Sequence, residues 1–228
     1  MSHYSSSITK LVTAALYKSF GWMSLGLALT SSIAYLMAHS IYMRYMMMSS
    51  FLSILIFIAQ IGIVVLLSMF KDRLSYPATV CAFLSFAALT GATLSVIFLI
   101  YDISSILGIF FIASGMFIFM ATYGLMTKQN LGSLGVFAHM ALFGLVILGL
   151  LNVFIKSAQF DYFLSFIGVI VFSILVAVDI QKIRSLLSEM AYDNQEQNKM
   201  AVYGALTMYL NFINLFLDLL RLLGKKRE

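Results

Sequence analysis

The chain has 228 residues, of which 62% are hydrophobic and only 10% are charged, and its mean hydropathy is +1.00. Soluble domains carry about 25% charged residues, so this composition excludes a soluble protein and predicts an integral membrane protein. A single proline and the lack of alternating ten-residue segments favour helices over an outer-membrane barrel. The net charge of +5 favours contact with the lipid bilayer and its anionic lipids, and no nucleic-acid partner is expected.

Seven apolar segments follow one another, each close to the roughly 20 residues that a helix needs to cross a hydrocarbon core. They cover residues 20–38, 51–70, 78–100, 103–125, 134–155, 160–182 and 201–223. The links between them are short and leave no room for a soluble domain. We therefore expect an all-α protein with a cytoplasmic segment over 1–19, a transmembrane domain of seven helices over 20–223 and a basic tail over 224–228.

Lysine and arginine residues predict the orientation, because cytoplasmic links carry an excess of them. With the N-terminus in the cytoplasm, most basic residues fall on that side and few on the other. The cytoplasmic set is Lys10, Lys18, Lys71, Arg73, Lys128, Lys182, Arg184 and Lys199, and the opposite set is Arg44 and Lys156. Seven crossings place the basic tail outside, whereas a re-entrant last segment with six crossings would place it inside. The lengths of the segments favour seven crossings.

Small residues recur in two of the segments. Ala87, Gly91 and Ser95 lie at four-residue spacing in the third segment, and Gly108 and Gly115 follow a looser spacing in the fourth. Such residues let helices approach one another closely in a membrane. We interpret both sets as packing surfaces.

The last segment carries its polar residues along one helix face, because they recur at steps of three and four. The set is Gly204, Thr207, Asn211, Asn214, Asp218 and Arg221. Carboxylates and amides are costly against acyl chains, so this face should turn toward the interior of a bundle. We expect a helix that the others surround. The alternative is a helix on the membrane surface with its polar face in water.

The sixth segment carries one carboxylate, Asp179, near its end. Asp179 and Asn211 lie at equal separations from Gln195, which we take as the middle of the link between the last two segments. If both helices extend equally toward that link, the carboxylate and the amide meet at similar depth. An intramembrane carboxylate is a candidate functional group; the alternative is an ion pair with Lys182 or another basic residue of a link.

Four stretches resemble the Bax inhibitor-1 family, and specifically its bacterial members. They are GALTMYLNFINLFLDLLRLLG at 204–224, IGVIVFSILVAVDIQKI at 167–183, ALTGATLSVIFLIY at 88–101 and YGLMTKQNLGSLG at 123–135. The similarity runs from Ala14 to Gly224. It implies seven helices, six of them around a central C-terminal one, in the bacterial inner membrane. It also implies a pH-sensitive calcium leak.

The same resemblance implies a sensor made of two aspartates, one on each of the last two helices, that share a proton. Asp179 matches the first, and the second falls on Asn211, because the family's YLDFINLF reads YLNFINLF here. An Asp–Asn pair lacks repulsion between like charges. The amide favours the ionised carboxylate and burial favours the neutral one, and the sequence does not decide between them.

Three further polar side chains are candidates. The family's basic latch in the second-to-third link would be Lys71 or Arg73, and the alternative is ordinary membrane anchoring. Asp218 lies two turns after Asn211 and would add a second acidic group to the ion pathway; the alternative is an ion pair with Arg221, three residues on.

Calcium prefers six to eight oxygen ligands, and the chain offers few in its spans. We therefore expect no tightly bound metal and no cofactor beyond calcium in transit. Ser114 and His139 are the nearest approach to an intramembrane serine protease, but nothing aligns them, and we predict no catalytic residue. The chief alternative to a calcium channel is a non-conducting regulatory protein that binds another membrane protein.

Overall fold

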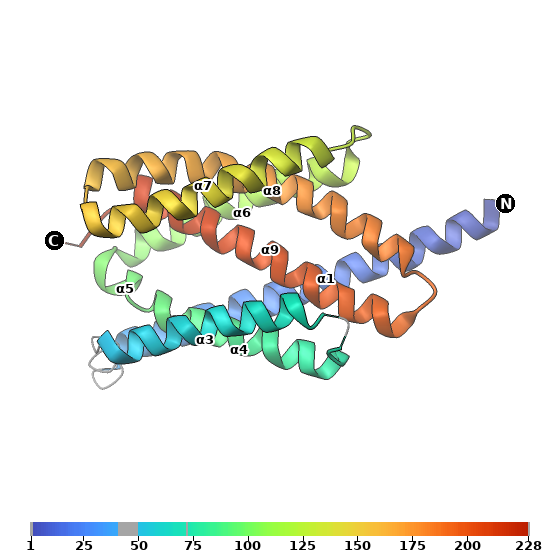
Figure 1. The fold of residues 1–228 in the computed structure, drawn as a ribbon, viewed down its shortest axis with the longest axis horizontal. Helices are drawn as coiled ribbons and strands as arrows, with labels where there is room; N and C mark the ends of the chain where they lie inside the picture. Colours follow the sequence, from blue (N-terminus) through green and yellow to red (C-terminus); the bar gives the residue numbers. More distant parts are fainter. Residues whose placement is uncertain (1, 41–49, 72, 228) are drawn as a thin grey trace. The chain divides into compact units, whose positions relative to one another are not determined.

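The computed structural model describes residues 2–40, 50–71 and 73–227, and every regular element in that part of the chain is a helix (Figure 1). The helices are α1 (Ser2–His39), α3 (Ser50–Met69), α4 (Tyr76–Leu94), α5 (Ile97–Ile100), α6 (Ile103–Met126), α7 (Gly132–Ile155), α8 (Ala158–Glu189) and α9 (Asn194–Leu223). Among the described residues, seven helices are long and apolar enough to cross a membrane. The predicted all-α membrane fold is confirmed. Arg44 lies outside the described residues.

Three helices extend beyond the apolar segments that predicted them. α1 includes most of the polar segment 1–19, and α8 continues to Glu189. α9 begins at Asn194, so the prediction that Gln195 lies in the middle of a link is wrong. A helix can continue through polar residues, whereas an apolar segment in the sequence marks only the part of the helix that lies inside the bilayer.

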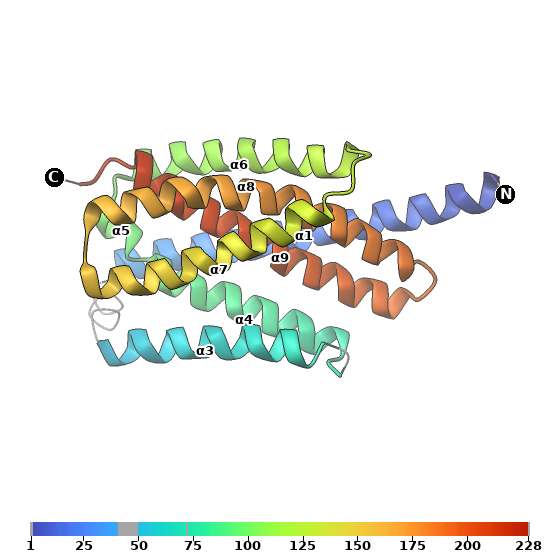
Figure 2. The same ribbon diagram turned by 45° about the horizontal axis from the view of Figure 1, so that its top comes forward.

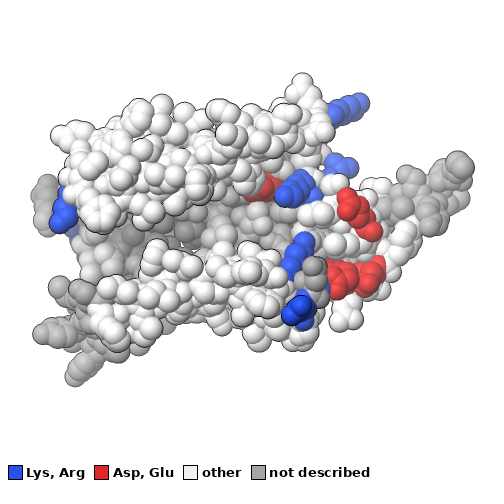
Figure 3. Space-filling view, viewed as in Figure 1, with Lys and Arg blue, Asp and Glu red and all other residues white. Residues whose placement is uncertain are grey.

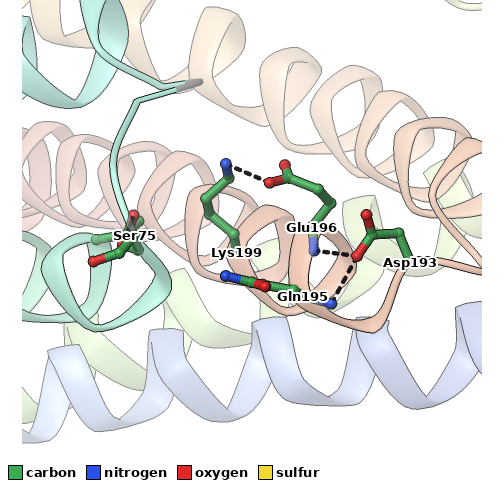
Figure 4. A network of polar contacts seen from close by, with 6 residues as sticks. Ser75, Asp193, Gln195, Glu196 and Lys199 are labelled. Atoms are coloured by element: carbon green, nitrogen blue, oxygen red, sulfur yellow. Dashed lines mark hydrogen bonds and ion pairs between the residues drawn. The ribbon is translucent and has the colours of Figure 1, made fainter.

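The early start of α9 has a local cause, which Figure 4 shows. One carboxylate oxygen of Asp193 accepts hydrogen bonds from the backbone N–H groups of Gln195 and Glu196, at 3.0 Å each. An aspartate in this position satisfies N–H groups that the first helical turn leaves without partners. One turn later, the Lys199 ammonium lies 2.7 Å from the Glu196 carboxylate.

The helices form two compact units. The first holds α1, α3, α4, α5, the end of α8 from Leu186 and the start of α9 to Leu206. The second holds α6, α7, α8 to Ser185 and α9 from Thr207. Both long helices α8 and α9 therefore contribute to each unit.

In the first unit, α4 packs against α1 and α3, and Figures 1 and 2 both show α3 beside α4. The Thr30 hydroxyl donates to the carbonyl of Ala87 at 2.8 Å. A Cβ atom at Gly91 would lie 2.6 Å from the carbonyl oxygen of Thr30. The small residues of the third segment therefore do bring two helices together, as predicted.

In the second unit, the predicted packing role of Gly108 and Gly115 is wrong. Both residues are exposed, and a Cβ atom on either would meet no described neighbour within 4 Å. The glycines that permit close approach are Gly124 on α6 and Gly135 on α7, both of which face α8. Sequence spacing alone does not distinguish a glycine that faces a neighbouring helix from one that faces away.

The basic tail pairs with the start of α6. The backbone N–H of Asp102 donates to the carbonyl of Lys225 at 3.1 Å, and the Lys225 N–H donates to the Ser105 hydroxyl at 2.9 Å. The tail therefore lies at the same end as the link between the third and fourth spans. Seven crossings predict this arrangement.

Burial differs sharply among the spans. In the most apolar stretch of 18 residues of each helix, 78% of the residues are buried in α9 and 61% in α8, compared with 6% in α3 and 11% in α7. On the face that Figure 3 shows, most acidic and basic side chains gather toward the ends, one acidic group lies further in, and the rest of the flanks is uncharged. These flanks suit acyl chains, and α8 and α9 provide buried positions for polar groups. The arrangement of six helices around α9 stays a prediction.

Candidate functional site

The structure brings Asp179 of α8 and Asn211 of α9 together within the second unit. The Asn211 side-chain amide donates to a carboxylate oxygen of Asp179 at 2.8 Å. Each residue is only 6% exposed. A hydrogen bond is stronger away from water than in it, so this buried bond fixes both side chains.

Close packing on two sides of α8 positions Asp179. A Cβ atom at Gly135 of α7 would lie 2.7 Å from the side chain of Val178, and one at Gly124 of α6 would collide with the backbone of Ala177. These two α8 residues directly precede Asp179, and both are buried. Because two glycines let α6 and α7 approach here, the backbone that carries the carboxylate has little freedom to move.

An aromatic cluster positions Asn211. Its neighbour in the chain, Phe212, packs edge to face against Phe110 and Phe117 of α6, with ring centroids 5.5 and 5.8 Å apart. Such pairs contribute about 0.5–1.5 kcal/mol each beyond their buried area. The cluster fixes the rotation of α9 about its own axis and so directs the Asn211 amide toward α8.

Two basic side chains lie within electrostatic range of Asp179: His139 of α7 and Lys182, one turn further along α8. The described residues form no ion pair between Lys182 and a carboxylate, so the salt bridge considered as an alternative is not present in that part of the chain. The His139 ring bonds through Nδ1 to the carbonyl of Gly135 at 2.8 Å.

Asp218 makes a separate polar site two turns further along α9. Its carboxylate lies 3.3 Å from the Arg221 guanidinium, the ion pair that the three-residue spacing predicts. It packs against Gly168 of α8, where a Cβ atom would collide with the carboxylate. The buried hydroxyl of Ser165 lies beside it without a hydrogen bond of good geometry.

The other polar side chains of this face of α9 are less buried. Thr207 and Asn214 are half-buried, and the Asn214 amide donates to the carbonyl of Leu210 on its own helix at 2.8 Å. The side chain of Arg221 is 49% exposed. Asn211 and Asp218 are therefore the two side chains of this face that burial singles out.

The predicted basic latch residues belong to the first unit. The Lys71 ammonium lies 5.7 Å from the centre of the Tyr203 ring on the first half of α9, a cation–π contact. Arg73 is exposed, and its backbone N–H donates to the carbonyl of Phe70.

Neither a metal cluster nor a nucleophile–base contact is found among the described residues. No three His, Cys, Asp or Glu side chains there are placed to hold a metal ion together. The Ser114 hydroxyl donates to the carbonyl of Phe110 on its own helix at 2.8 Å, and the His139 ring bonds to the carbonyl of Gly135 within α7.

Sequence analysis missed a clamp beside the site. The Gln181 side chain accepts a hydrogen bond from the Leu131 N–H and donates to the carbonyl of Gln129, both at 2.9 Å. Arg184 donates to the carbonyl of Leu125 at 2.7 Å. The link between α6 and α7 is thereby tied to α8. In the sequence, polar residues merely become more frequent after Val178, which is also typical of an ordinary helix end.

Fold and site together define a multi-pass α-helical membrane protein with a buried Asp–Asn pair between two of its spans. Comparison with known proteins identifies the family: the model described as "Inhibitor of apoptosis-promoting Bax1" matches residues 12–228. The chain belongs to this family, the Bax inhibitor-1 family. It is 39% identical over 210 residues to the inner membrane protein YbhL of Escherichia coli, which covers 91% of this chain and 90% of that protein.

Two further relatives extend over similar lengths. A protein of Borreliella burgdorferi is 38% identical over 214 residues, covering 93% of this chain and 92% of the relative. The protein RP147 of Rickettsia prowazekii is 38% identical over 213 residues, covering 92% and 89%.

Proposed function

We propose that this chain is a cation leak pathway of the bacterial inner membrane, with calcium as the principal ion and the Asp179–Asn211 pair as its control point. The observation that supports this most is the hydrogen bond of 2.8 Å between two side chains that are each 6% exposed. A carboxylate in a span is costly and is most often found where it serves transport. The name of the E. coli relative supports the location.

In the proposed resting state, the Asn211 amide is hydrogen-bonded to the Asp179 carboxylate. An entering cation displaces this bond and takes the carboxylate and the Asn211 carbonyl oxygen as ligands. Calcium needs six to eight oxygens, so this pair holds a partly hydrated ion only briefly, as passage requires. No catalytic step is assigned to the chain.

The proposal also covers pH modulation and orientation. With one carboxylate in place of two, the pair has no shared proton, so we expect leak to respond only to protonation of Asp179 itself. The excess of basic residues in one set of links supports a cytoplasmic N-terminus. Lys71 is the better candidate for the basic latch, because its contact with Tyr203 ties the α3–α4 link to α9. Asp218 is assigned a structural role through Arg221.

The test is calcium uptake by proteoliposomes that contain a calcium-sensitive dye. Asp179→Asn should lower the leak about tenfold or more, because losing one charged ligand costs at least about 1.4 kcal/mol. The matched control is Asp161→Asn, the same chemical change at an exposed position of α8. It should leave the leak unchanged.

Two results would overturn the proposal. A normal leak in Asp179→Asn would remove the pair from the ion route. No leak above empty liposomes in the unchanged protein would favour the non-conducting, partner-binding alternative.

A further inference from the structure

A pocket of about 1100 Å³ lies in the second unit between α7, α8 and the link that joins α6 to α7. This volume is slightly above the usual range for small-molecule sites, about 300–1000 Å³. The pocket lies beside the Asp179–Asn211 pair, since Val178 and Lys182 of α8 line it, but neither member of the pair does. Nothing in the proposed function uses it.

One end of the pocket is basic. Lys128 from the link and Lys182 from α8 both line it. The clamp explains why they meet: Gln181, next to Lys182, bonds to the carbonyl of Gln129, next to Lys128. Both lysines are exposed, and within the described part of the chain neither forms an ion pair. The clamp therefore holds two positive charges at one rim, and neither lies within ion-pair distance of a described carboxylate.

The α7 wall of the pocket is apolar except for His139. Val136, Met140 and Phe143 follow one another along one face of α7, and all three line the pocket. They are 65%, 69% and 68% exposed, so protein covers little of this wall. From the start of α7 at Gly132 to Phe143 the helix rises roughly 16 Å. A ligand that is anionic at one end and largely apolar along the rest would match the two lysines and the α7 wall.

We propose that this pocket binds an anionic phospholipid, with its phosphate at Lys128 and Lys182 and an acyl chain along Val136, Met140 and Phe143. Basic pockets between spans on the cytoplasmic side are typical sites for anionic headgroups. A zwitterionic lipid carries an ammonium group that the two lysines repel. A small soluble anion would leave the apolar wall unfilled. The inference does not depend on ion conduction.

The test is native mass spectrometry of the full chain in mild detergent, which removes general attraction to a charged membrane surface. The protein is mixed with equal amounts of phosphatidylglycerol and phosphatidylcholine of the same acyl chains, and the ratio of bound lipids is measured. The unchanged protein should prefer phosphatidylglycerol. Lys128→Gln and Lys182→Gln should each lower that preference about fivefold, and together should abolish it.

A matched control loses the same charge elsewhere: Lys225→Gln with Lys226→Gln in the basic tail should keep the preference. Lys128→Arg with Lys182→Arg, which preserves the charge, should also keep it and shows that the pocket tolerates substitution. Glycerol 3-phosphate, a headgroup without acyl chains, should bind far more weakly than the lipid.

Three results would overturn the proposal. Equal binding of the two lipids by the unchanged protein would show that no anion-selective site exists. Equal loss of preference in the tail variant would show an effect of net charge alone. Binding of glycerol 3-phosphate as strong as that of phosphatidylglycerol would show a site for soluble anions.

Discussion

Replacing Asn211 by aspartate tests the chemistry of the buried pair most sharply. The bond between Asn211 and Asp179 measures 2.8 Å, so the change would place two carboxylates at about that separation. With an effective dielectric constant of about 20, two negative charges at this distance repel by about 6 kcal/mol. That is about four powers of ten in a proton-binding equilibrium, so the variant pair should hold one proton between its two carboxylates near neutral pH.

The assay is calcium uptake by proteoliposomes between about pH 5 and pH 9. Asn211→Asp should acquire a transition attributable to one shared proton, because release of that proton leaves two charges that must separate or bind a cation. Asn214→Asp is the matched control, since it makes the same change one turn away at a half-buried position. Identical pH profiles for the unchanged protein and Asn211→Asp, or the same transition in Asn214→Asp, would refute the reasoning.

Two other substitutions test packing and the second acidic group. Gly135→Val should lower the melting temperature in detergent, since overpacking against α8 costs about 1–3 kcal/mol, whereas Gly144→Val on the same helix meets open space and should not; equal melting temperatures would contradict the close approach. Asp218→Asn breaks the ion pair with Arg221 and should cost about 1 kcal/mol or less, because the arginine is half exposed, and calcium leak should persist; a lost leak in a folded variant would move Asp218 into the ion route.

The sequence predicts the membrane fold and the polar pair because the bilayer makes polar residues conspicuous. Asp179 and Asn211 stand out in apolar surroundings, and lipid forces such groups inward. Their meeting was expected from equal separations to Gln195. Gln195 lies within α9, so it does not mark the middle of the link between the two helices. The prediction that Asp179 and Asn211 meet holds for another reason: a buried carboxylate needs a hydrogen-bonding partner.

What the sequence does not provide is the direction in which small and basic side chains face. Gly108 and Gly124 look alike in an apolar segment, but only Gly124 meets a neighbouring helix. In the sequence, Lys128 and Lys182 look like ordinary membrane anchors. They come together at the pocket because Gln181 forms hydrogen bonds with residues fifty or more positions away, which the sequence does not reveal. Helix rotation and contacts between distant segments decide both, and neither leaves a periodic signal.

The most direct test of the central claim is a double-mutant cycle on calcium leak, with Asp179→Asn, Asn211→Ala and the two combined in the same liposomes. If the two side chains act as one control point, the combined variant should leak at the rate of Asp179→Asn alone, because the partner of the amide is already gone. If the combined variant shows the product of the two single effects, the residues act independently and the pair does not control the leak.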